Sequence, residues 1–574
     1  MTPAKLILSA CLLGLAGCSA VEKPPAVEAA APTTATVPAP PPITPAPADR
    51  RTEYADALFS TFTSERPGLA VLVTQDGKPV YERYFGMADL EHSVRVTELS
   101  RFHVASVSKQ FTAYAAALLA AEGKLDMDAD IRTYLPDMPD FGKPVTTRML
   151  LNHTSGIRDQ WALFILAGYD FQDFLKQSAA LSFARNQREL NFEPGSTYEY
   201  SNGGYSVAAT VVEKVSGQSL RRFLEERVFG PLGMTDTFVY DDAGEIVRNR
   251  AMSYTAGATP RLSRLNYNNY GATSLHSTPR DLAKWAQELI EPRLLNASAI
   301  AMLKQRGRLN DGTQLTYALG VGLNPSAGRP AVSHGGSDAG YRAQFSVFPE
   351  DKASVVVLSN GTADTGMLAE RLAGIFLANG TGDMSPGDAS PPPPADKLAP
   401  LVGHYAPEHG PGLELRLQGD VLMAYHAGIP AQLSFRNDGR FYVGNPPGNP
   451  PNWIRLAPDG GALLRGRGEG TVETLRRFVP VTPAAADLRP LVGAYHSDEA
   501  DITYRLTLDG STLRLSSVRT APIGLTAMDK DRFAAPAMFG SVLRIVRNRA
   551  GKPTGFRISM MGGRLRNVLF ERVD

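Results

Sequence analysis

The sequence predicts an α+β domain over residues 51–380, followed by two small all-β domains over 396–482 and 483–574. Three observations lead to this prediction. Strand-like runs lie at both ends of the first region with helical patterns between them, the last part of the chain contains an internal repeat, and proline-rich stretches, 19–50 and 381–395, separate the parts. A chain of 574 residues with 43% hydrophobic residues can build several globular cores, which excludes a wholly disordered protein.

The first 18 residues predict an export signal. A short apolar run, Leu6–Ala16, follows a basic start, and the segment Leu15–Cys18 resembles the lipobox of bacterial lipoproteins. The resemblance implies that Cys11 is removed with a signal peptide over residues 1–18 and that Cys18 carries the lipid. Ser19 then implies an anchor in the bacterial outer membrane that faces the periplasm. A plain secretory signal is the alternative.

The stretch from Ser19 to Arg50 predicts a tether. Its nine prolines favour an extended polyproline-like chain that spans up to roughly 100 Å. A second proline-rich stretch, Thr381–Ala395, predicts a linker between domains.

Hydrophobic periodicity predicts the elements of the first large region. Two apolar runs around Gln75–Lys78 indicate a hairpin, and an alanine-rich helix ends at Gly123. Strands at both ends favour one sheet that unites the two ends of the domain. The predicted strands and helices are 69–74, 79–86, 111–122, 280–290, 344–349 and 354–359.

The last part of the chain repeats itself. Leu401–Tyr405 (LVGHY) recurs 90 residues later as Leu491–Tyr495 (LVGAY), and both copies alternate apolar and polar residues, as in Leu413–Leu417. Two copies are too few for a solenoid, so the repeat predicts two separate all-β units, each a small barrel.

Charge and cysteine content exclude several classes of protein. The chain has 59 basic and 58 acidic side chains, which argues against a nucleic-acid partner. Both cysteines lie in the first 18 residues, so the rest can form no disulfide and no thiolate metal site. The nine histidines show no metal-binding spacing, and we expect no metal and no cofactor.

Ser106 and Lys109 are the first candidates for chemistry. A serine and a lysine three residues apart on a helix face the same side, so the amine can reach the hydroxyl. Burial would lower the pKa of the lysine and let it accept the serine proton near neutral pH. On its own the pattern is weak, because it is expected about once by chance in a chain of this length.

Further motifs give this pair a context. Tyr198–Tyr205 (YEYSNGGY) follows a Pro-Gly turn, Leu150–Ile157 reads LLNHTSGI, and His334–Ser337 (HGGS) precedes a strand. In this order the motifs resemble serine β-lactamases and penicillin-binding-protein-like hydrolases over about residues 52–380. The resemblance is closest to the class C-like branch, which includes D-aminopeptidases, DD-carboxypeptidases and related esterases.

The resemblance implies a role for each matched residue. Ser106 is the nucleophile and Lys109 its base, Tyr200 relays a proton to or from the leaving group, and Asn202 orients the lysine and the substrate. The backbone N–H groups of Ser106 and Ser337 form the oxyanion hole.

His334, Gly335 and Gly336 stand where the family commonly has Lys-Thr-Gly. Glycines there let a substrate backbone lie close to the strand. Histidine is mostly neutral at pH 7, so we expect a weaker preference for C-terminal carboxylates unless Arg342 restores the charge.

Other residues near these motifs have simpler interpretations. Tyr267–Asn269 also fits Tyr-x-Asn, but Tyr200 is preferred because a Pro-Gly turn precedes it. His153 is expected to fix a loop and Tyr198 to pack at the rim. Asp338, like Arg342, is expected on a solvated rim, although either can line the cleft.

The sequence therefore predicts a membrane-tethered serine hydrolase that cleaves amide or ester bonds of small peptides, or esters, through an acyl-enzyme. Two eight-stranded, lipocalin-like barrels after the catalytic domain resemble the layout of D-aminopeptidases, in which an accessory loop restricts the cleft to short substrates with a free amine. The barrels can equally be spacers or partner-binding modules. The alternatives are a penicillin-binding DD-carboxypeptidase or β-lactamase-like enzyme, and a non-catalytic lipoprotein that binds the cell wall.

Overall fold

The structure, a computed structural model, describes most of the chain from Arg50 onward. The predicted signal peptide with Cys18, the tether before Arg50 and most of the predicted 381–395 linker lie outside the described residues. The chain divides into two compact units, Met1–Ala48 and Asp49–Asp574, and only the second is considered below. Among the described residues, none of the helices is both long enough and apolar enough to cross a membrane. The described residues are 50–170, 173–255, 259–377, 391, 393–407, 412–426, 429–436, 438–443, 452–457, 460–467, 472–535, 538 and 540–574.

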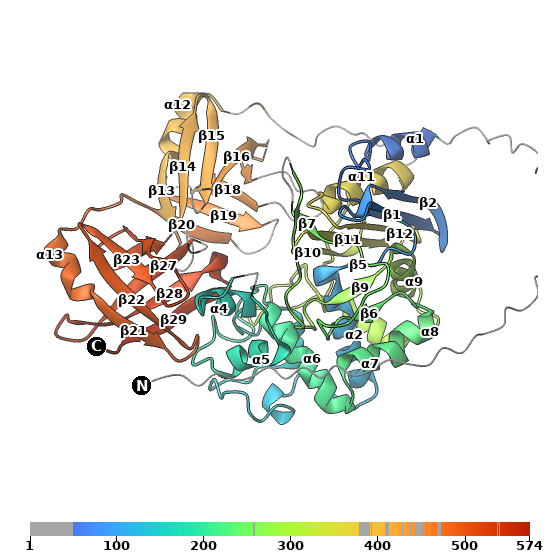
Figure 1. Cartoon of the computed structure of the whole chain (residues 1–574), viewed down its shortest axis with the longest axis horizontal. Helices are drawn as coiled ribbons and strands as arrows, with labels where there is room; N and C mark the ends of the chain where they lie inside the picture. Colours follow the sequence, from blue (N-terminus) through green and yellow to red (C-terminus); the bar gives the residue numbers. More distant parts are fainter. Residues whose placement is uncertain are drawn as a thin grey trace, which may run out of the picture. The chain divides into compact units, whose positions relative to one another are not determined.

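A five-stranded antiparallel sheet unites the two ends of the first domain (Figure 1). Its strand order is β10-β11-β12-β1-β2, and β1 pairs with β12 along its whole length, from Leu69 opposite Ser359 to Gln75 opposite Ala353. The predicted hairpin is confirmed, because Asp76 and Gly77 join β1 to β2 with positive φ angles of 50° and 73°. The strands are β1 (Leu69–Gln75), β2 (Lys78–Phe85), β10 (Val332–Asp338), β11 (Tyr341–Phe348) and β12 (Ala353–Ser359).

Both faces of the sheet are buried at its central strands, whereas the edge strand β2 is largely exposed. In β12, Val355 and Val357 pack with α1 and α11 on one face, whereas Val356 and Leu358 belong to the main core on the other. The main core also takes side chains from α2 and α9. The two predicted helices are therefore confirmed, and the helices named here are α1 (Arg50–Ala57), α2 (Lys109–Ala121), α9 (Pro279–Ile290) and α11 (Thr365–Leu377).

A helical region fills the chain between the sheet strands. Its central helix, α6, begins after the N-cap Ser201, whose side chain accepts from Gly204 N, and ends at the left-handed Gly217. Short strands connect the helices. The helical segments are η1 (Ala105–Ser108), η2 (Ile131–Thr133), α3 (Thr147–Leu151), α4 (Gln160–Leu166), α5 (Gln177–Arg185), α6 (Asn202–Ser216), α7 (Leu220–Leu224), η3 (Glu225–Phe229), α8 (Gly230–Leu232) and α10 (Ala297–Leu303). The short strands are β3 (Met87–Asp89), β4 (Val94–Arg95), β5 (Phe102–His103), β6 (Phe238–Val239), β7 (Tyr254–Thr255), β8 (Arg261–Leu262) and β9 (Leu275–Ser277).

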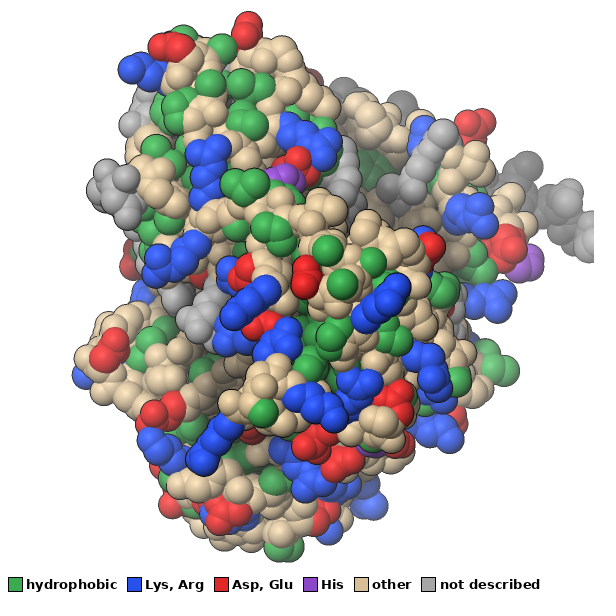
Figure 2. Space-filling model, turned by 90° about the vertical axis from the view of Figure 1, so that its left-hand side faces the viewer, with side chains coloured by type: hydrophobic (Ala, Val, Ile, Leu, Met, Phe, Trp, Pro, Cys, Tyr) green, Lys and Arg blue, Asp and Glu red, His purple; other side chains and the backbone are tan. Residues whose placement is uncertain are grey.

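The first C-terminal domain is a closed eight-stranded barrel with its own apolar core. It follows the short helical segments α12 (Ala395–Leu398) and η4 (Ala399–Leu401). On the face shown in Figure 2, basic and acidic side chains are intermixed, in keeping with the net charge of +1. The strands are β13 (Gly403–Ala406), β14 (Leu413–Gln418), β15 (Val421–His426), β16 (Ile429–Phe435), β17 (Phe441–Val443), β18 (Asn452–Leu456), β19 (Ala462–Arg467) and β20 (Val472–Phe478).

The second C-terminal domain differs from the expected eight strands. It is a nine-stranded sheet in the order β24-β23-β22-β21-β29-β28-β27-β26-β25, and the two edge strands are separated only by Leu525. The two edge strands, β24 and β25, are thus two halves of one short segment, and the sheet forms a nearly closed barrel. It follows α13 (Ala485–Leu488) and η5 (Arg489–Leu491), and its strands are β21 (Gly493–Ser497), β22 (Ile502–Asp509), β23 (Thr512–Ser516), β24 (Ile523–Gly524), β25 (Thr526–Ala527), β26 (Arg532–Ala535), β27 (Ser541–Arg547), β28 (Pro553–Met560) and β29 (Leu565–Arg572).

The LVGxY repeat has the same structural role in both barrels. The Tyr405 hydroxyl donates to Leu401 O at 3.0 Å, and the Tyr495 hydroxyl donates to Leu491 O at 2.7 Å. Each tyrosine is almost fully buried and ties the first strand of its barrel to the helical turn before it. The repeated motif therefore stabilises the start of each barrel.

The second barrel shares its core with helix α4 of the catalytic domain. Ala162, Leu163, Ile165 and Leu166 of α4 lie in one apolar cluster with the barrel interior. The buried ion pair between Arg158 and Glu499, 2.9 Å apart, lies beside this contact. The catalytic domain and the second barrel thus form one continuous packed structure.

Candidate active site

Ser106 lies on a tight turn in front of helix α2. The turn is the 3₁₀ segment η1, and Ala105, directly before the serine, has a φ of +49°, which is strained for a residue with a side chain. The Ser108 hydroxyl donates to Ala105 O at 2.6 Å and accepts from Leu275 N at 3.1 Å, so the turn is held from inside. The serine therefore stands half-buried on a fixed turn, not within the helix as expected.

Lys109 is completely buried and its amine contacts three oxygen atoms. The distances from Nζ are 3.1 Å to Ser106 Oγ, 2.8 Å to Asn202 Oδ1 and 2.7 Å to Ala272 O. Burial lowers the pKa of Lys109 to about 7, against an opposing effect of the Asp159 carboxylate. Near neutral pH a large fraction of this amine is therefore uncharged and can accept the Ser106 proton.

Asp159, which the sequence did not indicate, holds Asn202 in place. Its Oδ2 accepts from Asn202 N at 2.9 Å and from Asn202 Nδ2 at 2.8 Å, and it also caps helix α4 through Trp161 N. With its amide nitrogen held in this way, Asn202 presents Oδ1 to Lys109. The signal in the sequence was an N-cap aspartate, which indicates a helix start but no site.

Tyr200 completes the group around Ser106. Lys109 Nζ lies 4.8 Å from the centre of the Tyr200 ring. Burial raises the pKa of Tyr200, and a hydrogen bond with the Ser106 side chain and the nearby Arg564 cation oppose that rise. The phenol therefore stays protonated near neutral pH and can pass a proton between Ser106 and a leaving group.

The alternative tyrosine, Tyr267, lies in a different cluster. Its hydroxyl bonds to His103 Nε2 at 3.0 Å, to Thr273 Oγ1 at 3.2 Å and to the Asp338 carboxylate. The expectation that Asp338 belongs to a solvated rim is therefore wrong, because buried hydroxyl groups donate to it. Within the described residues, no hydrogen bond links Tyr267 to Ser106 or Lys109.

His153 orients Tyr200. Its ring packs 4.2 Å from the Tyr200 ring, and its Nδ1 accepts from Ser201 N at 3.1 Å. Burial lowers the pKa of His153 far below its usual range, with smaller contributions from the Lys109 and His334 charges, so this ring is neutral. The predicted loop-fixing role fits these contacts.

His334 faces the same group of aromatic rings from strand β10. Its Nδ1 lies 2.6 Å from Gly335 O, so Nδ1 carries the proton in this arrangement, and Nε2 can accept from the Tyr317 hydroxyl at 3.0 Å. The ring centres of His334 and Tyr200 are 6.4 Å apart. The edge-strand motif therefore lies next to the predicted proton relay.

The structural reason for a glycine at position 336 differs from the expected one. A side-chain carbon at this position would lie 2.3 Å from Val104 O, so the strand packs directly on the chain that leads into Ser106. The protein's own backbone, rather than a substrate, fills that space. By strand alternation Gly335 and the exposed Ser337 lie on the other face of β10 from Gly336, and β10 contacts the η1 turn that carries Ser106.

The comparison with protein families agrees with this arrangement. The family model Beta-lactamase matches residues 55–380, more than half of the chain. The chain belongs to this family. It is a serine hydrolase of the β-lactamase and D-aminopeptidase type.

Two relatives of this β-lactamase-family chain are D-aminopeptidases. The protein from Brucella anthropi is 28% identical over 461 residues, which cover 78% of this chain and 82% of the relative. The protein from Brucella canis is 30% identical over 299 residues, which cover 51% of this chain and 56% of the relative.

Two solved structures share the fold. The octameric penicillin-binding protein homologue from Pyrococcus abyssi is 22% identical with a TM-score of 0.53, and the match covers 74% of this chain and 99% of that chain. SurE is 21% identical with a TM-score of 0.51, and the match covers 75% of this chain and 99% of that chain.

Arg564 is a further residue of the site that the sequence did not indicate. It follows the turn η6 (Met561–Gly563) between β28 and β29 of the second barrel. Its guanidinium lies 5.3 Å from the centre of the Tyr200 ring. No local pattern predicts this approach, because 373 residues separate Arg564 from its hydrogen-bond partner Asn191.

Arg342 does not supply the charge that His334 lacks. Its guanidinium donates to Ala339 O at 3.1 Å and to Tyr341 O at 2.7 Å, at the turn between β10 and β11. The cation is thus directed to its own turn and not to His334.

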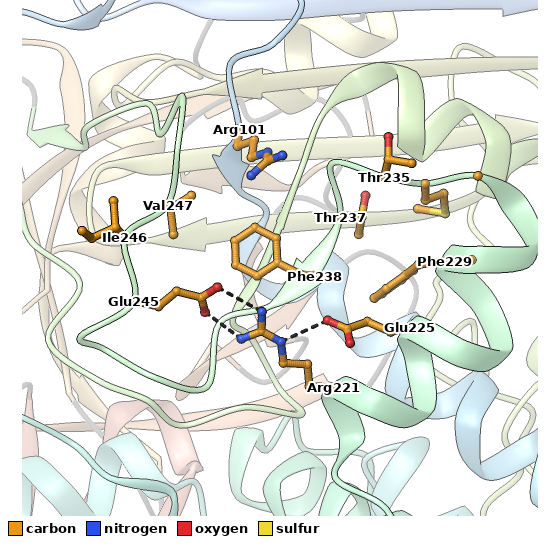
Figure 3. A pocket seen from close by; sticks show the side chains of 13 residues that line it. Arg101, Arg221, Glu225, Phe229, Thr235, Thr237, Phe238, Glu245, Ile246 and Val247 are labelled. Atoms are coloured by element: carbon orange, nitrogen blue, oxygen red, sulfur yellow. Dashed lines mark hydrogen bonds and ion pairs between the residues drawn. The ribbon is translucent and has the colours of Figure 1, made fainter.

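A separate pocket of about 360 Å³ shares no residue with this site (Figure 3). Arg221 is its central charge and pairs with Glu225 at 3.0 Å, Glu245 at 2.6 Å and Asp241 at 3.2 Å. Its cation is already compensated within the fold, so the candidate active site remains the one around Ser106.

Proposed function

We propose that the chain is an acyl-enzyme hydrolase that cleaves amide or ester bonds of small peptides, or esters. The observation that supports this proposal is the amine of Lys109, which contacts both Ser106 and Asn202 while burial lowers its pKa to about 7. A buried lysine with such a pKa is costly to the fold and suits a general base.

In the proposed reaction, the Ser106 oxygen attacks the carbonyl carbon while Lys109 accepts the hydroxyl proton. The N–H groups of Ser106 and Ser337 stabilise the tetrahedral oxyanion. Tyr200 then delivers a proton to the leaving amine or alcohol as the bond to the carbonyl breaks. The Lys109 ammonium then returns its proton to Tyr200, so that the amine is neutral again. A water molecule attacks the acyl-serine and gives its proton to Lys109, which passes it to the Ser106 oxygen as the acid is released.

A D-aminopeptidase-like preference for short peptides is the finer part of the proposal. Its support is the name of the relatives and the turn of the second barrel that lies against Tyr200. Because Arg564 narrows this side of the site, long polymers fit poorly. A DD-carboxypeptidase-like enzyme is the second candidate, and the Arg564 cation favours it.

Replacement of Ser106 by alanine tests the proposal. We expect a fluorophosphonate probe to label the wild type and the control Ser60→Ala, whose serine is exposed on the surface, but not Ser106→Ala. Hydrolysis of D-amino-acid amides, acyl-D-Ala-D-Ala, nitrocefin and p-nitrophenyl esters should disappear in parallel. Labelling at another residue, or no labelling by any activated ester, contradicts the proposal and leaves the non-catalytic binding protein.

We further propose that lipidated Cys18 attaches the hydrolase to the bacterial envelope membrane, with its substrates in the periplasm. The support is the Leu15–Cys18 motif and the proline-rich tether after it. Full-length protein from cells should enter the detergent phase on partition, and Cys18→Ser should stay in the aqueous phase. Equal partition of the two would refute the anchor.

A further inference from the structure

We propose that Arg564 binds a carboxylate of the substrate, so that the hydrolase selects short substrates with a negative charge close to the scissile bond. This inference rests on the proposed function and names the substrate class of that site. It assigns to the second barrel a direct part in recognition.

The backbone of Arg564 is fixed by the catalytic domain. Its carbonyl oxygen accepts from Asp159 N at 3.1 Å and from Asn191 Nδ2 at 2.8 Å, and Arg566 N donates to Asn191 Oδ1 at 2.8 Å. Asp159 is the same residue that orients Asn202. The position of Arg564 is therefore tied to the position of the catalytic amide.

The turn that carries Arg564 is built to fit against this domain. Three consecutive residues, Met561, Gly562 and Gly563, have positive φ angles of 53°, 67° and 96°. A side-chain carbon on Gly563 would lie 3.4 Å from Glu199 Oε2 and 3.1 Å from Arg566 Nη2. This compact turn sends the next side chain towards Tyr200.

Arg564 forms no ion pair among the described residues, whereas its neighbours Arg566 and Arg158 do. Arg566 pairs with Glu199 at 3.3 Å and Arg158 pairs with Glu499 at 2.9 Å, but no ion pair within the described ranges includes Arg564. The guanidinium is half-buried against the Tyr200 ring. The Glu199 carboxylate, which pairs with Arg566, also lies within electrostatic range of the Arg564 charge. A partly desolvated guanidinium beside a nucleophile, with no ion pair of its own, provides a planar donor that fits a carboxylate.

The other charges of the site favour the same class of ligand. His334 is held by Tyr317 and its own backbone, and Arg342 is directed to its turn. Besides the buried Lys109 amine, the cation next to the Tyr200 ring is thus Arg564, which attracts a substrate carboxylate. The expectation from His334 alone was a weaker preference for carboxylates, and Arg564 reverses it in this proposal.

Binding measured without turnover tests the inference. On the Ser106→Ala background, calorimetry compares acetyl-D-alanyl-D-alanine with its C-terminal amide, and succinyl-D-alaninamide with its methyl ester. We expect the carboxylate member of one pair to bind about 10- to 100-fold more tightly, with a preference that shrinks at high salt. Arg564→Gln should reduce the preference at least tenfold, Arg564→Lys should restore part of it, and the control Arg514→Gln, on the exposed β22–β23 hairpin, should keep it.

An equal affinity for both members of both pairs, or a preference unchanged in Arg564→Gln, would overturn the assignment of Arg564. Since the binding ratio needs no hydrolysis, it stays informative if Ser106 proves inactive. Absence of fluorophosphonate labelling would refute the proposed hydrolysis, and the carboxylate preference would still stand or fall on its own measurement.

Discussion

The charge state of Lys109 leads to a prediction for the pH dependence of hydrolysis. A pKa of about 7 in place of 10.5 means that the surroundings of Lys109, burial and nearby charges together, cost its charged form about 5 kcal/mol relative to water. With this pKa, about 10% of the amine is neutral at pH 6 and about 90% at pH 8. If the neutral amine is the base, kcat/KM rises about tenfold between these pH values and is nearly flat above pH 8.

Asp159→Asn shifts this profile in a known direction. The Asp159 carboxylate raises the pKa of Lys109, so its removal lowers that pKa and moves the rising limb to lower pH. The asparagine has one acceptor oxygen in place of two, so it cannot accept both from Asn202, at 2.9 and 2.8 Å, and from Trp161 N, and kcat/KM on the plateau should fall by at least tenfold. Asp76→Asn, in the exposed β1–β2 turn, removes the same charge away from the site and should leave the profile in place.

The assay is p-nitrophenyl acetate hydrolysis from pH 5.5 to 9.5 at constant ionic strength, with Ser106→Ala as the background. A rate that keeps rising tenfold per pH unit to pH 9.5 would show that Lys109 has an ordinary pKa, and would refute the role of burial. A limb that moves to higher pH in Asp159→Asn would refute the assignment of its charge.

Two further substitutions test the packing behind the site. Gly336→Ala places a carbon 2.3 Å from Val104 O, so we expect the free energy of unfolding to fall by about 2 kcal/mol or more and Tm to fall with it. The control Gly374→Ala, whose new carbon meets no atom within 4 Å, should keep or raise Tm. Equal Tm values for the two variants would contradict the close contact at Gly336. Arg158→Met leaves Glu499 buried without its partner and should lower the free energy of unfolding, measured in urea, by about 3–5 kcal/mol. The double variant Arg158→Met/Glu499→Leu should recover most of this loss. No recovery would show that the pair contributes more than charge compensation.

The elements of the fold could be predicted because their signals are local. The apolar run at 69–74, the Asp76-Gly77 turn and the alanine-rich run before Gly123 each specify an element within a few residues. The pairing of β1 with β12 followed from the position of the strands at the two ends of the domain. The nearly closed second barrel was not predicted exactly in strand number, because the interruption at Leu525 depends on how the sheet curves.

The site divides in the same way. Ser106 and Lys109 lie one turn apart, and Tyr200 and Asn202 share one motif, so a local pattern could place them near one another. Asp159 and Arg564 gave no such signal, because an N-cap and a turn arginine occur throughout soluble proteins. The same limit applies to Gly336, because the atom that excludes a side chain there, Val104 O, belongs to a distant part of the chain.

The apolar side chains of α4 inside the second barrel limit how this hydrolase can be dissected. A fragment that ends at the last described residue of α11, Leu377, would expose Ala162, Leu163, Ile165 and Leu166 to water. Such a fragment would carry Ser106 and Lys109 and yet tend to aggregate. A chain that has not yet produced its last strands lacks Arg564 as well, so during synthesis the specificity of the enzyme would be acquired last. Exchange of the barrel between relatives would accordingly transfer substrate choice together with solubility.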